Sequence, residues 1–312
     1  MAHPLKPVRR ADSNGGSPKP RRLLLKLNAT MPCDTAFRII ARRHLDALGA
    51  THDATCQGDV EALHQMRIAL THLRAAIQFF SPIVEDQARD QIRQELKWLN
   101  GELGGLRDLD VAIENIKSAN PDRPQAIPHL EIWHEKRIEA HRTLLRSLRS
   151  ARYRRLIARL SSWIDSGAWA TKRGRQAMKR RAAPIGAYSA DKLTEWEDRL
   201  IGKSRKLRKM GARKRHRLRL LNKKLNYAIE SVADLFADKR LSRQKAAMKQ
   251  LRRAQRSLGQ LNDDVRGRML AHELRRQGVK TPVHAIGPKR EKQLLRKAET
   301  AYRKLEALNL AR

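Results

Sequence analysis

The segment DVEALHQMRIALTHLRAAIQFF, residues 59–80, decides the fold class of this chain. Its apolar residues recur at alternating steps of three and four, as expected for one face of an α-helix. They are Leu63, Met66, Leu70, Leu73, Ile77 and Phe80. Asp59 is a favourable N-cap, and Ser81-Pro82 ends the pattern. The segment is therefore predicted to form a long amphipathic helix that buries one face.

The same spacing extends over most of the chain after Asp34. A second apolar stripe, with Trp98 beside it, contains Leu96, Leu99, Leu103 and Leu106. Asn120-Pro121 through Pro128 marks the next break. No run combines β-branched residues with strict alternation, so no strand is predicted. Long helices joined by short breaks indicate an all-α fold built from antiparallel helical bundles.

The composition indicates how the chain is divided. Residues 1–30 carry seven Lys or Arg, four prolines and a single acid, Asp12, which predicts a disordered basic tail. Residues 169–190 are rich in Gly, Ala and Arg, contain Pro184 and show little periodicity, which predicts a linker. We therefore expect a first helical bundle at about 34–168, a linker at about 169–190 and a second bundle at about 191–310.

The charge of the chain indicates its partner. Lys and Arg total 68 against 32 Asp and Glu, a formal net charge of +36. An excess of this size destabilises the compact state by self-repulsion, so an anionic partner is expected. Residues 202–224 alone hold twelve Lys or Arg and no acid, with enough leucine spacing to predict helix over much of the block. Composition does not choose between polyanions.

No feature of the sequence indicates a membrane or an oxidising compartment. The longest early apolar stretch, Leu23 to Leu25, is too short for a signal peptide or a membrane span. Cys33 and Cys56 form neither a CxxC pair nor a disulfide framework. A cytoplasmic protein is the expectation.

Two motifs recur along the chain. His64-Gln-Met-Arg67 is echoed 152 residues later by His216-Arg-Leu-Arg219. The run Leu103 to Asp108, with sequence LGGLRD, recurs 155 residues later as LGQLND, Leu258 to Asp263. Self-similarity at nearly constant offset predicts two similar helical bundles, with a small length difference in a connecting loop.

The repeated motifs carry side chains suited to phosphate. His64, Arg67, Thr71 and Arg74 advance by three and four and form a stripe beside the apolar one. The second stripe is His216, Arg219, Lys223 and Asn226, and on the following helices Lys97 corresponds to Arg252. Arginine binds phosphate oxygens bidentately, while lysine and histidine add charge or a hydrogen bond. The alternative is a structural role, in which both histidines satisfy helix-boundary hydrogen bonds and both arginines pair with Asp108 and Asp263.

The motifs resemble a known family. His64-x-x-Arg67-x5-Leu73-Arg74, followed by Lys97-Trp98-Leu99-Asn100-Gly-Glu-Leu103-Gly104-x-x-Arg107-Asp108-Leu109-Asp110, is similar to the CHAD family, the conserved histidine α-helical domain. The resemblance covers about residues 34–310. It implies two four-helix bundles related by a pseudo-two-fold axis. It also implies a basic groove that binds inorganic polyphosphate and an association with cytoplasmic polyphosphate granules.

The resemblance carries binding roles only to matching positions. The implied polyphosphate-binding residues are His64, Arg67, Arg74, Lys97, Arg107, His216, Arg219, Lys223, Lys224 and Arg252, with Arg93 and Arg256 as secondary candidates. The chain departs from the family pattern at Thr71-His72, where two basic residues are common, and at Asn226, where an arginine is common. Weaker phosphate contacts are expected at those two points.

Enzymatic motifs are missing from the sequence. The segment Glu195-x-Glu197-x-Arg199 only approaches the ExExK signature of triphosphate-tunnel enzymes, and it lies in a helical context. There is no phosphate-binding G-x-x-x-x-G-K-[ST] loop and no G-x-G-x-x-G dinucleotide motif. Asp108 and Asp110 point in different directions on a helix, and His52 with Cys56 lacks a second ligand pair. We expect no catalysis, no cofactor and no metal.

A nucleic-acid-binding protein is the alternative function. The basic tail and residues 202–224 would bind DNA or RNA non-specifically by charge alone. Against this reading, aromatic residues are 4% of the chain, which leaves few platforms for base stacking, and no helix-turn-helix or zinc-finger spacing is present. The sequence leaves the oligomeric state and the preferred polyphosphate length open.

Overall fold

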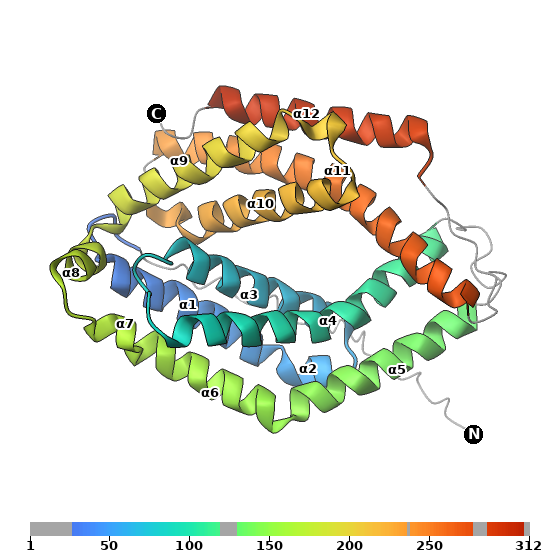
Figure 1. The fold of residues 1–312 in the computed structure, drawn as a ribbon, viewed down its shortest axis with the longest axis horizontal. Helices are drawn as coiled ribbons and strands as arrows, with labels where there is room; N and C mark the ends of the chain where they lie inside the picture. The colour runs from blue at the N-terminus through green and yellow to red at the C-terminus, as the bar shows by residue number, and fades with distance from the viewer. Residues whose placement is uncertain (1–26, 119–129, 236–237, 277–285, 309–312) are drawn as a thin grey trace, which may run out of the picture.

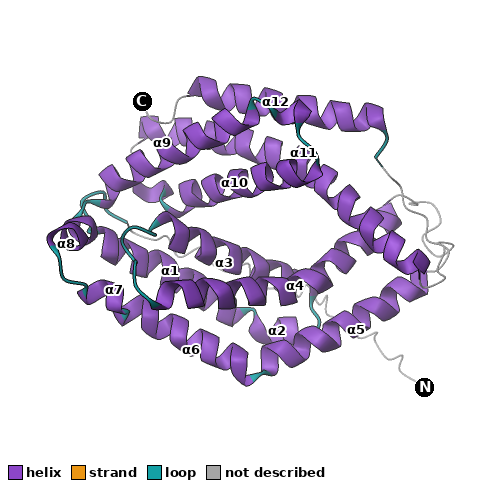
Figure 2. Ribbon diagram, viewed as in Figure 1, coloured by secondary structure: helices purple, strands orange, loops and turns teal. Residues whose placement is uncertain are grey.

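The computed structural model describes residues 27–118, 130–235, 238–276 and 286–308. The regular secondary structure in that part of the chain is helical, joined by loops and turns, apart from one isolated β-bridge between Pro32 and Pro184 (Figure 2). The predicted all-α fold is confirmed. None of the helices in these ranges has a stretch apolar enough to cross a bilayer.

Two sets of long helices make up the fold (Figure 1). The first contains α1 (Cys33–Ala50), α2 (His52–Cys56), α3 (Val60–Phe79), α4 (Ala88–Ser118), α5 (Leu130–Arg149) and α6 (Ala151–Ser166). The second contains α9 (Ile185–Ser204), α10 (Ala212–Ser231), α11 (Asp238–Arg276) and α12 (Pro288–Leu308). Between them lie the short helices α7 (Ala168–Thr171) and α8 (Arg175–Ala182).

Helix α3 forms for the reasons visible in its sequence. The Asp59 carboxylate accepts a hydrogen bond from the Ala62 backbone N–H (2.8 Å), which satisfies a donor of the first turn. Every residue of the predicted apolar stripe is at most 2% exposed. These side chains belong to one large hydrophobic core that also takes in residues of α9 to α12. The predicted helix at 59–80 is confirmed, with its end at Phe79.

The core is arranged so that α3 and α10 meet between the two sets. Helix α3 packs on α1 and α4, and α10 packs on α9 and α11, while α3 and α10 also contact each other. The two helices lie side by side near the middle of the molecule (Figure 1). Each therefore has one face toward its own set and one toward the other set. The pseudo-two-fold relation between the sets remains a prediction from the sequence repeat.

Helices form within the segment 169–190, which the sequence predicts to be a linker. It contains most of α7, all of α8 and the start of α9. Trp169 and Ile185 are completely buried, so the core reaches into the segment from both ends. Alanine and arginine favour helix even without an apolar stripe, which accounts for α8. The second set of helices therefore begins at Ile185 rather than at about 191.

The predicted tail, residues 1–30, is too long by at least four residues. Residues 1–26 lie outside the described part of the structure, but Leu27 is 7% exposed and belongs to the core. The Ala29 and Met31 carbonyls accept hydrogen bonds from Gly186 (2.9 Å) and Ile185 (2.8 Å). The chain is therefore held in place from Leu27 onward, beside the start of α9.

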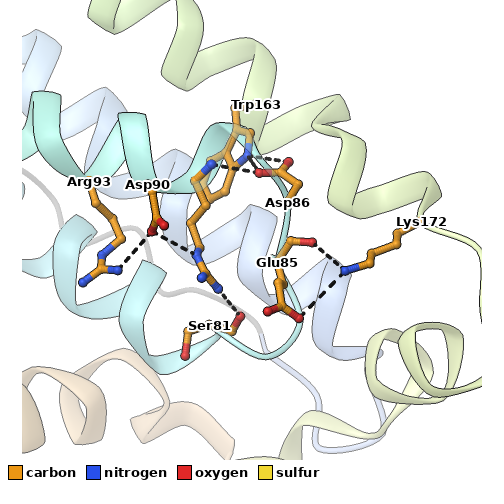
Figure 3. Close-up of polar contacts among 8 residues, drawn as sticks. Ser81, Glu85, Asp86, Asp90, Arg93, Trp163 and Lys172 are labelled. Carbon is orange, nitrogen blue, oxygen red and sulfur yellow. Dashed lines mark hydrogen bonds and ion pairs between the residues drawn. The ribbon is translucent and has the colours of Figure 1, made fainter.

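The turn between α3 and α4 is held by one carboxylate, Asp86 (Figure 3). Its oxygens accept hydrogen bonds from the Arg89 backbone N–H (2.9 Å) in the first turn of α4, from Trp163 Nε1 (2.9 Å) and from the Trp169 backbone N–H (3.2 Å). Both indole rings are buried and pack edge-on against Phe37 of α1. Asp86 thus ties the start of α4 to α6 and α7.

Candidate anion-binding site

Arg67 of α3 and Arg219 of α10 occupy the place where the two sets of helices meet. Both side chains are half-buried. Arg67 Nη1 and Arg219 Nε are buried atoms without a hydrogen-bond partner among the described residues. Burial lowers the pKa of both guanidinium groups, and each is lowered further by the positive charge of Arg266. Because arginine stays charged in proteins, these are buried cationic donors with unused hydrogen-bonding capacity.

Two glycines leave room for these guanidinium groups. A Cβ at Gly104 of α4 would lie 3.4 Å from Arg67 Nη1, and a Cβ at Gly259 of α11 would lie 3.9 Å from Arg219 Nε. The repeated Leu-Gly motif therefore places a small residue beside the arginine in both halves. A larger side chain at either glycine would occupy the space beside the arginine, where an anion could approach.

Further cations surround the two arginines. Burial lowers the pKa of Lys223 to about 8, and the charges of Arg219 and Arg67 add to the effect. Burial also lowers the pKa of His64, which the charges of Arg107 and Lys223 lower further. We call this set the central cluster: His64, Arg67, Arg107, Arg219, Lys223 and Arg266, with the acids Asp108 and Asp263. It draws on α3, α4, α10 and α11.

Asp108 and Asp263 do not form the ion pairs with Arg67 and Arg219 that a purely structural role predicts. The charges of Asp108 and Asp263 raise the pKa of Arg67 and Arg219 respectively, but neither pair forms an ion pair within the described ranges. Asp108 instead pairs directly with Arg266, which reaches across from α11. Comparison of the two halves of the sequence did not indicate Arg266, because the matching position in the first half is Val111.

A second group of cations lies further along α3. Burial lowers the pKa of Arg74 and of Lys224, and the charges of Arg93 and Arg199 lower the pKa of Lys224 further. We call Arg74, Arg93, Lys224 and Arg199 the Arg74 cluster; it draws on α3, α4, α9 and α10. Arg93 is turned toward Asp90, at 3.2 Å (Figure 3). Arg199 carried no signal in the sequence beyond its place in the rejected ExExK match.

The remaining predicted residues lie apart from these clusters. Lys97 is exposed on α4, one turn beyond Arg93, and Arg256 is exposed on α11. His216 Nδ1 is hydrogen-bonded to Asn262 Oδ1 (2.6 Å). Arg252 is ion-paired to Glu230 of α10, with 2.7 Å between Nη2 and Oε1. The structure thus brings together His64, Arg67, Arg107, Arg219 and Lys223 in one place and Arg74, Lys224 and Arg93 in another.

A cavity of about 1230 Å³ opens beside the central cluster, between α4, α5 and α11. Asp108, Asp263 and Arg266 line it together with apolar residues such as Leu109 and Trp133. The aspartates therefore stand between a cationic region and a mainly apolar hollow. Their negative charge disfavours an anion inside the hollow.

The two cysteines and the metal-ligating side chains in the described ranges form no cluster. No three His, Cys, Asp or Glu side chains gather there as a metal site would require. Cys56 Sγ lies 3.8 Å from His52 Nε2, and burial raises the pKa of its thiol. Burial raises the pKa of Cys33 to about 12, so this thiol is a weak nucleophile. The arrangement supports binding of an anion through hydrogen bonds and charge.

Comparisons with known proteins agree on the fold. A family model described as "CHAD domain" matches residues 39–272. The crystal structure of the CHAD domain from the plant Ricinus communis is similar, with a TM-score of 0.69 at 23% identity, covering 91% of this chain and 90% of that one. PptA from Streptomyces chartreusis is similar at a TM-score of 0.55 and 18% identity, covering 90% and 98%. No protein with a curated description matches the sequence.

Proposed function

The chain belongs to the CHAD family, and from that membership together with the central cluster we propose that it binds inorganic polyphosphate without cleaving it. The family resemblance implies this ligand. The observation that carries the proposal for this chain is the pair of buried, unpartnered guanidinium nitrogens on Arg67 and Arg219. Buried donors normally have partners, so donors left open at a cationic site favour an anion with several oxygens as their partner.

Polyphosphate fits this arrangement better than nucleic acid does. Its negative charges lie along a single flexible chain, so one molecule can contact both the central cluster and the Arg74 cluster. On α3 these clusters are about two turns apart, at Arg67 and Arg74, a rise of about 10 Å. Recognition of single-stranded nucleic acid relies on aromatic platforms for stacking. The two clusters as defined contain no Phe, Tyr or Trp, and the His64 imidazole is their one aromatic ring.

A competition assay at fixed salt tests the proposal. A labelled DNA duplex is bound first, and the concentration of competitor that displaces it is measured. Long-chain polyphosphate is expected to displace the duplex at a concentration at least about tenfold lower than that of unlabelled DNA of equal charge. Non-specific DNA binding depends on charge alone, so a selective polyphosphate site should show this difference. Equal competition by the two polyanions would contradict the proposal. The same samples, run on a gel, are expected to contain polyphosphate of unchanged length. In cells, the protein is expected to co-localise with polyphosphate granules.

Raising the pH through 8 is expected to weaken polyphosphate binding. The pKa of Lys223 is about 8 in the free protein, and a bound phosphate favours its charged form. Binding above pH 8 must therefore take up a proton, and the affinity should fall by up to about tenfold per pH unit there. Calorimetry at pH 8.5 in buffers of different ionisation enthalpy measures the uptake.

The control for this pH dependence is Lys223→Arg, which stays charged and should lose the proton uptake.

The stability of the free protein should change with pH in the direction opposite to the affinity. Between the lowered pKa of about 8 and the ordinary value of 10.5, the unfolded chain binds more protons at Lys223 than the folded chain. This group's contribution to the free energy of unfolding therefore rises with pH in that window. An affinity that is constant from pH 7 to 9.5 would show that Lys223 does not contact the ligand.

A further inference from the structure

The line of contact between α3 and α10 has two sides, and they differ in charge. On one side lies the Arg74 cluster, from α3, α4, α9 and α10. On the other side a group of polar residues comes from α1, α3, α10 and α11; we call it the Glu230 group. It consists of His44, His72, Asn226, Tyr227, Glu230 and Arg252.

The sequence repeat matches the two sides position by position. At the offsets of 152 and 155, Arg74 corresponds to Asn226, Lys224 to His72, Arg93 to Met248 and Lys97 to Arg252. Gln78 corresponds to Glu230. The first side therefore keeps a cation at four of these positions and has a neutral amide at the fifth. The second side keeps only Arg252, and it has an acid where the first has an amide.

Glu230 pairs with that remaining cation and neutralises its charge. Its Oε1 accepts hydrogen bonds from Arg252 Nη2 (2.7 Å) and from Asn226 Nδ2 (3.1 Å). Its Oε2 lies 3.6 Å from His72 Nε2. The carboxylate is 15% exposed, whereas Arg252 is 56% exposed. A phosphate that approached Arg252 would meet a fixed negative charge directly behind it.

We propose that Glu230 closes this second side to polyphosphate, so that the ligand is confined to the side of the Arg74 cluster. The inference rests on the proposed polyphosphate binding and names the residue that decides where the ligand lies. A phosphate at Arg252 could still use the other N–H groups of the guanidinium, but it would lie beside the Glu230 carboxylate, which Arg252 and Asn226 hold in place. Repulsion between the phosphate and this carboxylate disfavours a ligand bound on the second side.

The decisive experiment compares matched substitutions in the full chain by titration calorimetry with long-chain polyphosphate. Glu230→Gln keeps the shape of the side chain and removes its charge. It should raise the affinity about threefold or more, because a like charge beside the ligand is lost and Arg252 becomes available. Gln78→Glu places an acid at the matching position on the side of the Arg74 cluster. It should lower the affinity for polyphosphate by a factor at least as large as the factor by which Glu230→Gln raises it. Gln78 is exposed, so this variant should fold normally.

Arg252→Gln separates the possible explanations. In the wild-type background it should change the affinity less than Lys224→Gln does, and in the Glu230→Gln background it should remove the gain. The inference is overturned if Arg252→Gln alone weakens binding as much as Lys224→Gln, or if Glu230→Gln leaves the affinity unchanged. Both outcomes concern a wild-type protein that does bind polyphosphate. A wild type that does not bind polyphosphate would instead contradict the proposed function.

Discussion

Replacing Arg67 and Arg219 together with glutamine should lower the affinity for polyphosphate by at least about a hundredfold, since each charge-assisted hydrogen bond contributes about 1.5–3 kcal/mol. Both guanidinium groups are half-buried, and each has a buried nitrogen that no described residue satisfies. They stand on the two helices that join the halves of the molecule. Calorimetry or fluorescence titration with a defined polyphosphate measures the change.

The matched control removes two arginines elsewhere. Arg155 and Arg159 are exposed on α6, a helix that contributes no residue to either cluster. Their replacement with glutamine lowers the net charge by the same amount, so it tests the contribution of the overall positive field. The control should weaken binding only a few-fold and chiefly at low salt. If both double variants lose affinity equally, diffuse charge accounts for binding and the central cluster does not.

Replacing Asp86 with alanine should destabilise the fold by about 3 kcal/mol, the sum of a lost cap and of two hydrogen bonds from buried donors. The substitution leaves Trp163 Nε1 and the Trp169 backbone N–H without their acceptor inside the core. It also removes the acceptor of the Arg89 backbone N–H in the first turn of α4. Urea denaturation followed by tryptophan fluorescence measures the loss.

Asp90→Ala provides the comparison for this variant. Asp90 lies one turn further along α4, is 69% exposed, and only pairs with arginines at the surface. Exposed ion pairs contribute at most about 1 kcal/mol, so this variant should remain close to the wild type. Equal destabilisation by both substitutions would show that loss of acidic charge near the start of α4, rather than the buried hydrogen bonds, is responsible.

The sequence predicted those parts of the fold that depend on local spacing. The stripe from Leu63 to Phe80 is almost completely buried, as its spacing requires, and the all-α class follows from it. The helices within the predicted linker were not foreseen, because burial of Trp169 and Ile185 depends on residues far away in the chain, such as Phe37. A local lack of periodicity does not exclude a helix whose few apolar residues reach an existing core.

The candidate site was predicted in part for a similar reason. The repeat identified Arg67, Arg219 and the glycines beside them, because both copies retain these residues. It could not identify Arg266 or Glu230, whose matching positions, Val111 and Gln78, are uncharged. Charges present in only one copy are invisible to self-comparison, and their contacts become apparent only when α3, α4, α10 and α11 are assembled.

The meeting of α3 and α10 also sets an order of events during synthesis. Arg67 and Arg219 are 152 residues apart, so at about 5–20 residues per second the ribosome adds Arg219 roughly 8–30 s after Arg67. Helix α3 can pack on α1 and α4 in that interval, but its face toward α10 is uncovered. A polyanion that needs both arginines therefore cannot engage a growing or truncated chain in the same way. Tight polyphosphate binding is therefore expected only after α10 has packed against α3.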